Sequence, residues 1–232
     1  FDYQPELEAM LESGGKTDMI EKVRSSEMQA GKLFLTRQPK PLGLGHAIWC
    51  AKRLVGDEPF AIILPDDVIL NDKGCLAQMI EAYNEHGGNV VAVKDVPKEE
   101  TFRYGILDVE EENGSLVKMR RIVEKPKVED APSTLSVIGR YILQPEVFDY
   151  LGEFESGTGG EIQLTDSMAK LIGKQPFHGY RFSGDHYDSG SRLGFICANM
   201  AFGMQDSEIG EGVREAILKF ANNIDTSVKG VV

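Results

Sequence analysis

The stretch FAIILPDD, residues 60–67, decides the fold that we expect, because a short continuous apolar run ends there in two carboxylates. Such a run is typical of a strand that is buried on both faces of a parallel sheet. Segments in which apolar residues recur at helical spacing lie on either side of it, so strands and helices alternate along the chain. This alternation predicts an α/β fold with a Rossmann-like mixed, mainly parallel sheet and flanking helices.

The other elements are expected on both sides of this strand. Beyond residue 100, three strand-like runs follow one another without a long helix between them, which predicts an added antiparallel portion of the sheet. The expected strands are Phe34–Thr36, Phe60–Pro65, Asn89–Val93, Tyr104–Val109, Leu116–Val123, Leu135–Leu143 and Phe177–Phe182. The expected helices are Phe1–Met10, Asp18–Ser25, His46–Leu54, Leu76–Tyr83, Glu161–Ile172, Gly190–Gly203 and Glu208–Ala221. Without a recognisable linker or repeat, we expect a single domain over residues 1–224 and a frayed tail over residues 225–232.

The composition argues against several classes of protein. A net charge of −12 disfavours a nucleic-acid-binding protein, which needs a basic face to neutralise phosphates. No apolar run approaches the roughly 18 residues that span a bilayer, and the chain does not open with a secretory signal. The widely spaced cysteines Cys50, Cys75 and Cys197 suit neither a disulfide framework nor a zinc site. We therefore expect a cytoplasmic protein with reduced thiols that binds neither nucleic acid nor membrane.

Two acidic clusters are candidates for a metal site. Asp66 and Asp67 follow the apolar run, and ligands of open α/β sheets bind at the carboxyl ends of strands. Asp188 precedes a glycine-containing turn that opens a predicted helix. One or two carboxylates together with substrate phosphates suit Mg²⁺. The alternative is that these aspartates only cap helices or turns.

Three further segments combine glycine or proline with polar side chains. Gly43 and Gly45 leave room for a ligand near the backbone, although a simple glycine-rich turn before a helix has the same pattern. Glu124 and Lys125 stand at a strand end before a proline, where they suit sugar hydroxyls and phosphate, or form a solvated surface pair. Glu161 follows two glycines, and it either faces a polyhydroxylated ligand or merely favours a helix N-terminus.

Taken in order, these segments resemble one family, the sugar-1-phosphate nucleotidylyltransferases. The resemblance begins at the first residue and continues to about Phe220. Its motifs are Gln38 with Leu42–His46, Asp66 in LPDD, Tyr104-Gly105, Glu124–Pro126, Gly160–Asp166 and Asp188–Gly190. The bacterial members that use UTP and glucose 1-phosphate are the most similar. The resemblance implies the nucleotide-diphospho-sugar transferase type of fold and a homodimer or homotetramer.

The resemblance also implies an activity and a role for each matched residue. An oxygen of glucose 1-phosphate attacks the α-phosphorus of UTP, and pyrophosphate leaves. Asp66 and Lys125 are implied as catalytic residues, and Asp66 and Asp188 as ligands of Mg²⁺. The implied substrate-binding residues are Gln38 and Gly43 for uracil, Lys125 for the sugar phosphate, and Gly105, Glu124 and Glu161 for glucose.

One departure from the family concerns the start of the chain. The family opens with a strand and a Gly-x-Gly-Thr-Arg loop that grips the triphosphate, and this sequence has no counterpart. We therefore expect an N-terminal piece of the enzyme to be missing and this chain alone to be weakly active. Two alternatives stay open: a thymidylyltransferase or another member of the family, and a non-catalytic subunit that binds a nucleotide sugar.

Overall fold

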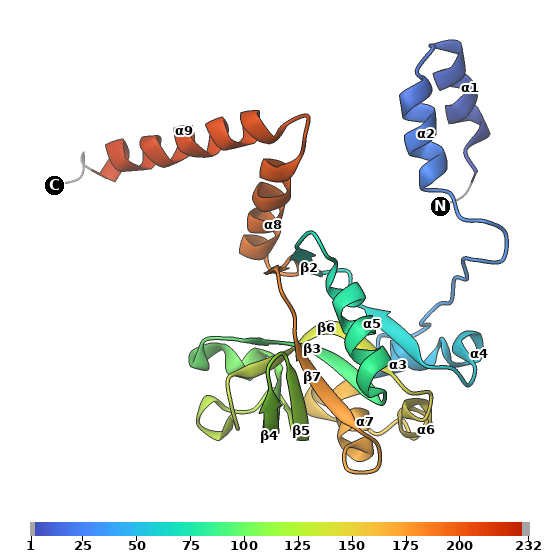
Figure 1. Ribbon diagram of the computed structural model, residues 1–232, viewed down its shortest axis with the longest axis vertical. Helices are drawn as coiled ribbons and strands as arrows, with labels where there is room; N and C mark the ends of the chain where they lie inside the picture. Colours follow the sequence, from blue (N-terminus) through green and yellow to red (C-terminus); the bar gives the residue numbers. More distant parts are fainter. Residues whose placement is uncertain (1–2, 229–232) are drawn as a thin grey trace. The chain divides into compact units, whose positions relative to one another are not determined.

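The computed structural model describes residues 3–228, and contacts divide the chain into two compact units (Figure 1). The first unit ends at Pro39, and the second begins at Lys40. The sequence predicts a single domain over residues 1–224, and its composition gives no sign of this boundary.

The first unit is a pair of short helices, α1 (Pro5–Ser13) and α2 (Thr17–Ser25), followed by irregular chain. Leu11 and Ile20 are its buried apolar side chains, and they hold the two helices together. Both helices are expected from the sequence, with starts that differ by a few residues.

A strand predicted at Phe34–Thr36 does not form. The described residues between α2 and Pro39 contain no strand, and the side chain of Leu35 is 88% exposed. The prediction was wrong because a short run of apolar and β-branched residues makes a strand only when a neighbouring strand satisfies its backbone groups.

The second unit is built on a six-stranded sheet with the order β1-β6-β3-β7-β5-β4. Its strands are β1 (Phe60–Ile63), β3 (Asn89–Asp95), β4 (Gly105–Asn113), β5 (Leu116–Glu124), β6 (Leu135–Leu143) and β7 (Phe177–Arg181). In the described part of this sheet β3 and β7 run parallel, and the other pairs are antiparallel. The predicted mixed sheet is confirmed, but its pairing is mostly antiparallel where the sequence predicts mainly parallel strands.

The apolar run at residues 60–65 explains that difference. β1 lies at the edge of the described sheet, antiparallel to β6. Phe60 stacks on Phe148 with 4.9 Å between ring centroids, whereas Ile63 on the same strand is 54% exposed. The strand is therefore only partly buried, and the prediction of burial on both faces was wrong. A run of apolar residues does not indicate the direction of the neighbouring strand, and it does not indicate how much of each face of the strand is buried.

Helices cover both faces of the sheet, as the alternation of side chains along β3 shows. Val90 and Ala92 pack with α5 (Cys75–His86) in one core, seen in front of the sheet in Figure 1. Val91 and Val93 belong to a larger core on the opposite face. The helices of that second face are α3 (Leu44–Trp49), α6 (Val147–Leu151) and α7 (Leu164–Leu171).

A second, two-stranded sheet pairs β2 (Asp67–Leu70) with β8 (Asp185–Asp188), and the sequence analysis missed both strands. Helix α8 (Arg192–Gln205) follows it, and the hydroxyl of Ser191 accepts a hydrogen bond from the Gly194 N–H at its start. Strands of four residues give too short a pattern to recognise, and no residue of β2 or β8 is fully buried, so neither strand shows an alternation of buried and exposed side chains.

Several predicted helices have other bounds. The helix expected at His46–Leu54 is divided into α3 and α4 (Lys52–Val55), and the one expected at Glu161–Ile172 begins only at Leu164. Helix α9 runs from Gly210 to Val228, so it includes part of the tail that we expect to be frayed; residues 229–232 lie outside the described chain. The shorter 3-10 turns are Lys98–Arg103, Val128–Asp130 and Thr158–Gly160. Among residues 3–228, no helix combines the length and apolar content that crossing a membrane requires.

Candidate active site

The small sheet brings Asp188 close to Asp66 and Asp67, which lie more than a hundred positions earlier in the sequence. Asp67 pairs with Asp188 across β2 and β8, and the Ser189 N–H donates to the Asp66 carbonyl oxygen at 2.7 Å. A methyl group on Gly190 would lie 3.1 Å from a carboxylate oxygen of Asp66 and 3.1 Å from one of Asp188. Both carboxylates therefore approach the same glycine, where a side chain would crowd them.

The two carboxylates differ in how they are held. Asp188 accepts a hydrogen bond from the Gly190 N–H at Oδ1 and from Arg103 at Oδ2, each at 3.0 Å. Asp66 is exposed. Among the described residues, no group of three or more His, Cys, Asp or Glu side chains is arranged to hold a metal ion. A pair of carboxylates fits Mg²⁺ only in the mode in which substrate phosphates and water complete the coordination.

Asp67 lies next to Asp66 in sequence but has a different environment. Its Oδ2 accepts from the Gly139 N–H at 2.9 Å, and its Oδ1 lies 2.5 Å from His186 Nε2. The Arg140 guanidinium donates to the carbonyl oxygen of Asp67 at 2.6 Å. These contacts fasten β2 to β6 and β8, so Asp67 orients the strand that begins beside Asp66. A side chain at Gly139 would lie 2.3 Å from Asp67 Oδ2, which explains the glycine.

A second polar cluster lies where β4 and β5 pair. Gly105 is directly opposite Glu124, and a methyl group on Gly105 would lie 3.2 Å from Glu124 Oε2. The Glu124 side chain is only 11% exposed, and its Oε1 lies 3.6 Å from Lys125 Nζ. Lys125 has a φ of 45°, and its N–H donates to the Tyr104 carbonyl at 3.0 Å.

The positive φ of Lys125 is a strained conformation for a residue other than glycine. It ends β5 just before Pro126 and brings the ammonium beside Glu124. Non-glycine residues keep such a conformation where the surrounding structure forces it, which is frequent at binding sites.

Tyr141 of β6 lies within electrostatic reach of both clusters. Burial raises the pKa of its phenol, and the negative charges of Asp67, Glu124 and Asp66 raise that pKa further. The phenol is therefore neutral at physiological pH. Tyr141 is therefore a buried residue near Asp66 and Asp67 at the β2–β8 end and near Glu124 at the β4–β5 end.

The glycine loop packs against the segment that carries Glu161. The Gly45 N–H donates to the Ile162 carbonyl and the Ile162 N–H donates to the Leu42 carbonyl, both at 2.8 Å. A methyl group on Gly43 would lie 2.7 Å from Glu161 Cβ. The close approach that these glycines allow is therefore made by the protein itself, which agrees with the simple glycine-rich turn, the alternative to a ligand-binding loop.

Glu161 and Gln38 lie outside the two acidic clusters. Glu161 lies in extended chain before α7 and not in a first helical turn, because the preceding Gly159 and Gly160 both have positive φ values. Gln38 belongs to the first unit, so its role toward a base stays a prediction.

Arg103 and Tyr141 are site residues that sequence reasoning missed. Arg103 stands beside the Tyr104-Gly105 motif, but no spacing relates it to Asp188, 85 positions later. Tyr141 lies in a strand whose apolar pattern predicts only burial.

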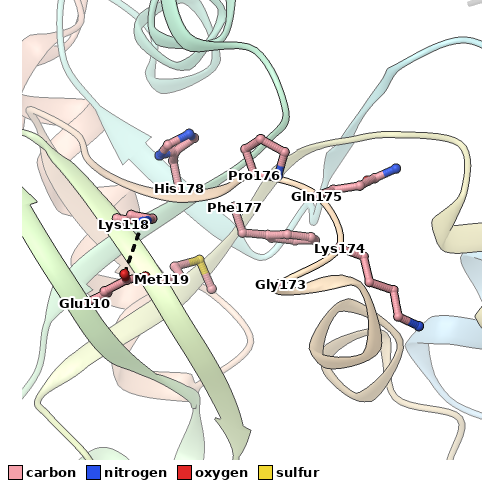
Figure 2. Close-up of a pocket in the computed structure, with 9 residues that line it drawn as sticks. All are labelled: Glu110, Lys118, Met119, Gly173, Lys174, Gln175, Pro176, Phe177 and His178. Atoms are coloured by element: carbon pink, nitrogen blue, oxygen red, sulfur yellow. Dashed lines mark hydrogen bonds and ion pairs between the residues drawn. The ribbon is translucent and has the colours of Figure 1, made fainter.

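A separate pocket of about 390 Å³ lies where β5 and β7 part, and no predicted site residue lines it (Figure 2). Lys118 and Glu110 form an ion pair at its rim, with 3.1 Å between Nζ and Oε1. Phe177 and Met119 belong to the core on the face covered by α7. His178 Nδ1 is buried there and has no hydrogen-bond partner among the described residues.

Comparisons with known proteins show the family to which the chain belongs. A family model described as nucleotidyl transferase matches residues 11–204. The chain belongs to the nucleotidyl transferase family. Within it, a UTP–glucose-1-phosphate uridylyltransferase from Komagataeibacter xylinus is 48% identical over 193 residues, which cover 83% of this chain and 68% of the relative. The resemblance seen in the sequence is thereby confirmed.

Two solved structures of the family are similar in fold. The UTP-bound UGPase from Acinetobacter baumannii has a TM-score of 0.84 and 36% identity, and the match covers 94% of this chain and 76% of that chain. A UDP-glucose pyrophosphorylase complexed with UDP-glucose has a TM-score of 0.69 and 40% identity over 72% of this chain and 64% of that one.

Proposed function

We propose that this protein transfers a uridylyl group from UTP to glucose 1-phosphate, giving UDP-glucose and pyrophosphate. The observation that carries the proposal is the convergence of Asp66 and Asp188 on Gly190. Relatives that carry the name of this activity and neighbours bound to UTP or UDP-glucose support the choice of substrates.

The reaction needs alignment and neutralisation of charge more than covalent help. The phosphate oxygen of glucose 1-phosphate attacks the α-phosphorus of UTP in line, and the bond to pyrophosphate breaks. When bound, Mg²⁺ supplies positive charge that stabilises the phosphate oxygens. Asp66 and Asp188 would hold it, because both carboxylates are accessible and converge on one glycine.

The polar cluster at the end of β5 suits the sugar phosphate. Lys125 would bind the phosphate of glucose 1-phosphate, since its side chain is 45% exposed beside the nearly buried Glu124. Glu124 would accept hydrogen bonds from glucose hydroxyls, together with the backbone of Gly105 and the carboxylate of Glu161. The roles of Gln38 and Gly43 toward uracil stay predictions from the resemblance.

We also place the enzyme in the cytoplasm as a homodimer or homotetramer. Three free cysteines agree with a reducing compartment. The exposed apolar side chains Ile209, Leu218 and Phe220, in and beside α9, agree with burial in an assembly.

The test is product formation from UTP, dTTP and ATP at a fixed concentration of glucose 1-phosphate. UDP-glucose and pyrophosphate should appear with UTP, stop when a chelator removes divalent cations, and resume when Mg²⁺ is restored. Asp188→Asn should lower the rate by about 100-fold or more, because one charged group of the site is lost. A preference for dTTP would identify a thymidylyltransferase. Binding of UDP-glucose without any release of pyrophosphate would identify a non-catalytic subunit.

A further inference from the structure

Arg103 is a cation in contact with the carboxylate cluster, and the proposed reaction has so far given it no role. It is the last residue of the 3-10 turn Lys98–Arg103 and directly precedes Tyr104 and Gly105. Its Nη2 lies 3.0 Å from Asp188 Oδ2 and its Nη1 lies 3.7 Å from Glu100 Oε2. The guanidinium carbon also lies 5.5 Å from the centre of the Tyr104 ring.

The two oxygens of Asp188 therefore face different partners. Oδ1 accepts from the Gly190 N–H, near Asp66, whereas Oδ2 accepts from Arg103. A divalent cation bound by Asp66 and Asp188 would share the Asp188 carboxylate with the guanidinium. Two positive charges on one carboxylate repel each other, so cation binding and the Arg103 contact oppose each other.

Arg103 also has room to move and a geometry that suits phosphate. Its side chain is 40% exposed, and it lines a cavity of about 350 Å³ that also includes Glu100, Tyr104, Asp188 and Ser191. A guanidinium presents parallel N–H donors that match two oxygens of a phosphate. Phosphates of a cation-bound substrate would lie next to Asp188. The long side chain of Arg103, which is two residues before the proposed sugar-binding residue Gly105, would reach them there.

We propose that Arg103 is a phosphate-binding residue, stored on Asp188 in the ligand-free protein and transferred to a phosphate oxygen when a divalent cation takes Asp188. This inference rests on the proposed function, since it requires phosphates at Asp66 and Asp188. Cation binding and phosphate binding are thereby coupled. The cation binds weakly while Arg103 neutralises Asp188, and substrate phosphate attracts the guanidinium away from Asp188. No bond is made or broken by Arg103 in this exchange.

The test measures two affinities of the purified protein by calorimetry: Mn²⁺ without nucleotide, and UDP-glucose at saturating Mn²⁺. Arg103→Met should bind Mn²⁺ about five- to tenfold more tightly, because the competing charge is gone. The same variant should bind UDP-glucose about tenfold or more weakly, because a charge-assisted hydrogen bond to phosphate is lost. Opposite signs in one variant are not expected from a general loss of structure.

Two variants serve as controls. Arg103→Lys keeps the charge, so its Mn²⁺ affinity should stay close to that of the wild type and its UDP-glucose affinity should be intermediate. Arg121→Met removes an arginine that also pairs with an aspartate, Asp108, at 2.7 Å, but on β5 away from the acidic cluster. It should change neither affinity. Arg103→Gln repeats the neutral substitution in case the methionine variant folds poorly.

Either of two results would overturn the inference: Mn²⁺ affinity of the neutral variants equal to or below that of the wild type, or unchanged UDP-glucose affinity. Failure of the proposed function is a separate result. In that case the wild-type protein would make no UDP-glucose, whatever residue stands at position 103.

Discussion

At the scale of single residues, neighbours in sequence have different roles in space. Asp66 is exposed beside Gly190, whereas Asp67 is held by Gly139, His186 and Arg140. The sequence indicated a pair of carboxylates for a cation, and the contacts leave one of them for that purpose. The second proposed ligand, Asp188, comes from the strand paired with β2.

Lys125 allows the charge and the backbone strain to be tested separately. Lys125→Gly removes the ammonium but suits the positive φ, so we expect activity to fall by about 100-fold while the free energy of unfolding is kept or slightly raised. Lys125→Met removes the ammonium and keeps the strain, so it should lose similar activity without that gain. Steady-state rates and urea denaturation of both variants are the measurements. Glycine-variant activity close to that of the wild type would contradict the role on phosphate.

At the scale of elements, the site is assembled by pairings between segments that are distant in sequence. β2 and β8 bring Asp66 to Asp188, and the loop around Gly43 and Gly45 pairs with residues 161–163. The glycines of the loop are needed for this second pairing, because a side chain would collide with Glu161 or Ile162.

Gly43→Ala should therefore destabilise the protein by about 2–4 kcal/mol, the sum of a strained φ and a steric collision. Gly56→Ala is the matched control: Gly56 also has a positive φ, of 70°, but nothing lies within 4 Å of the added methyl group. It should cost only the strain, about 1–2 kcal/mol. Chemical denaturation of the two variants measures the difference. Equal losses would show that the collision with Glu161 does not form in solution.

At the scale of the whole molecule, the sheet combines one parallel pair with antiparallel pairs and has a core on each face. The pocket where β5 and β7 part contains a half-buried imidazole, His178, whose pKa is lowered by this burial and then by the charges of His86 and Lys118. The unfolded chain therefore binds a proton at this histidine more readily than the folded protein does.

The contribution of His178 to the free energy of unfolding should consequently be fully present above a pH of about 6.5. It should be lost as the pH drops from there toward the lowered pKa of His178. His178→Asn should flatten this slope, although other groups still contribute below it. Melting temperatures of both proteins between pH 5 and 7.5 provide the measurement. Parallel curves for the two proteins would mean that His178 titrates alike in the folded and unfolded states.

The sequence by itself determined the family, since six short motifs stand in order along the chain, and it determined most long strands and helices through their apolar periodicity. Leu135–Leu143 was predicted with the bounds that the strand has. Only the tertiary structure decided that the sheet is mostly antiparallel, that Asp67 faces Asp188, and that Arg103 contacts the cluster. The physical reason is that apolar periodicity reflects the burial of a single segment. The partner of a strand, its direction and its register depend on residues far along the chain.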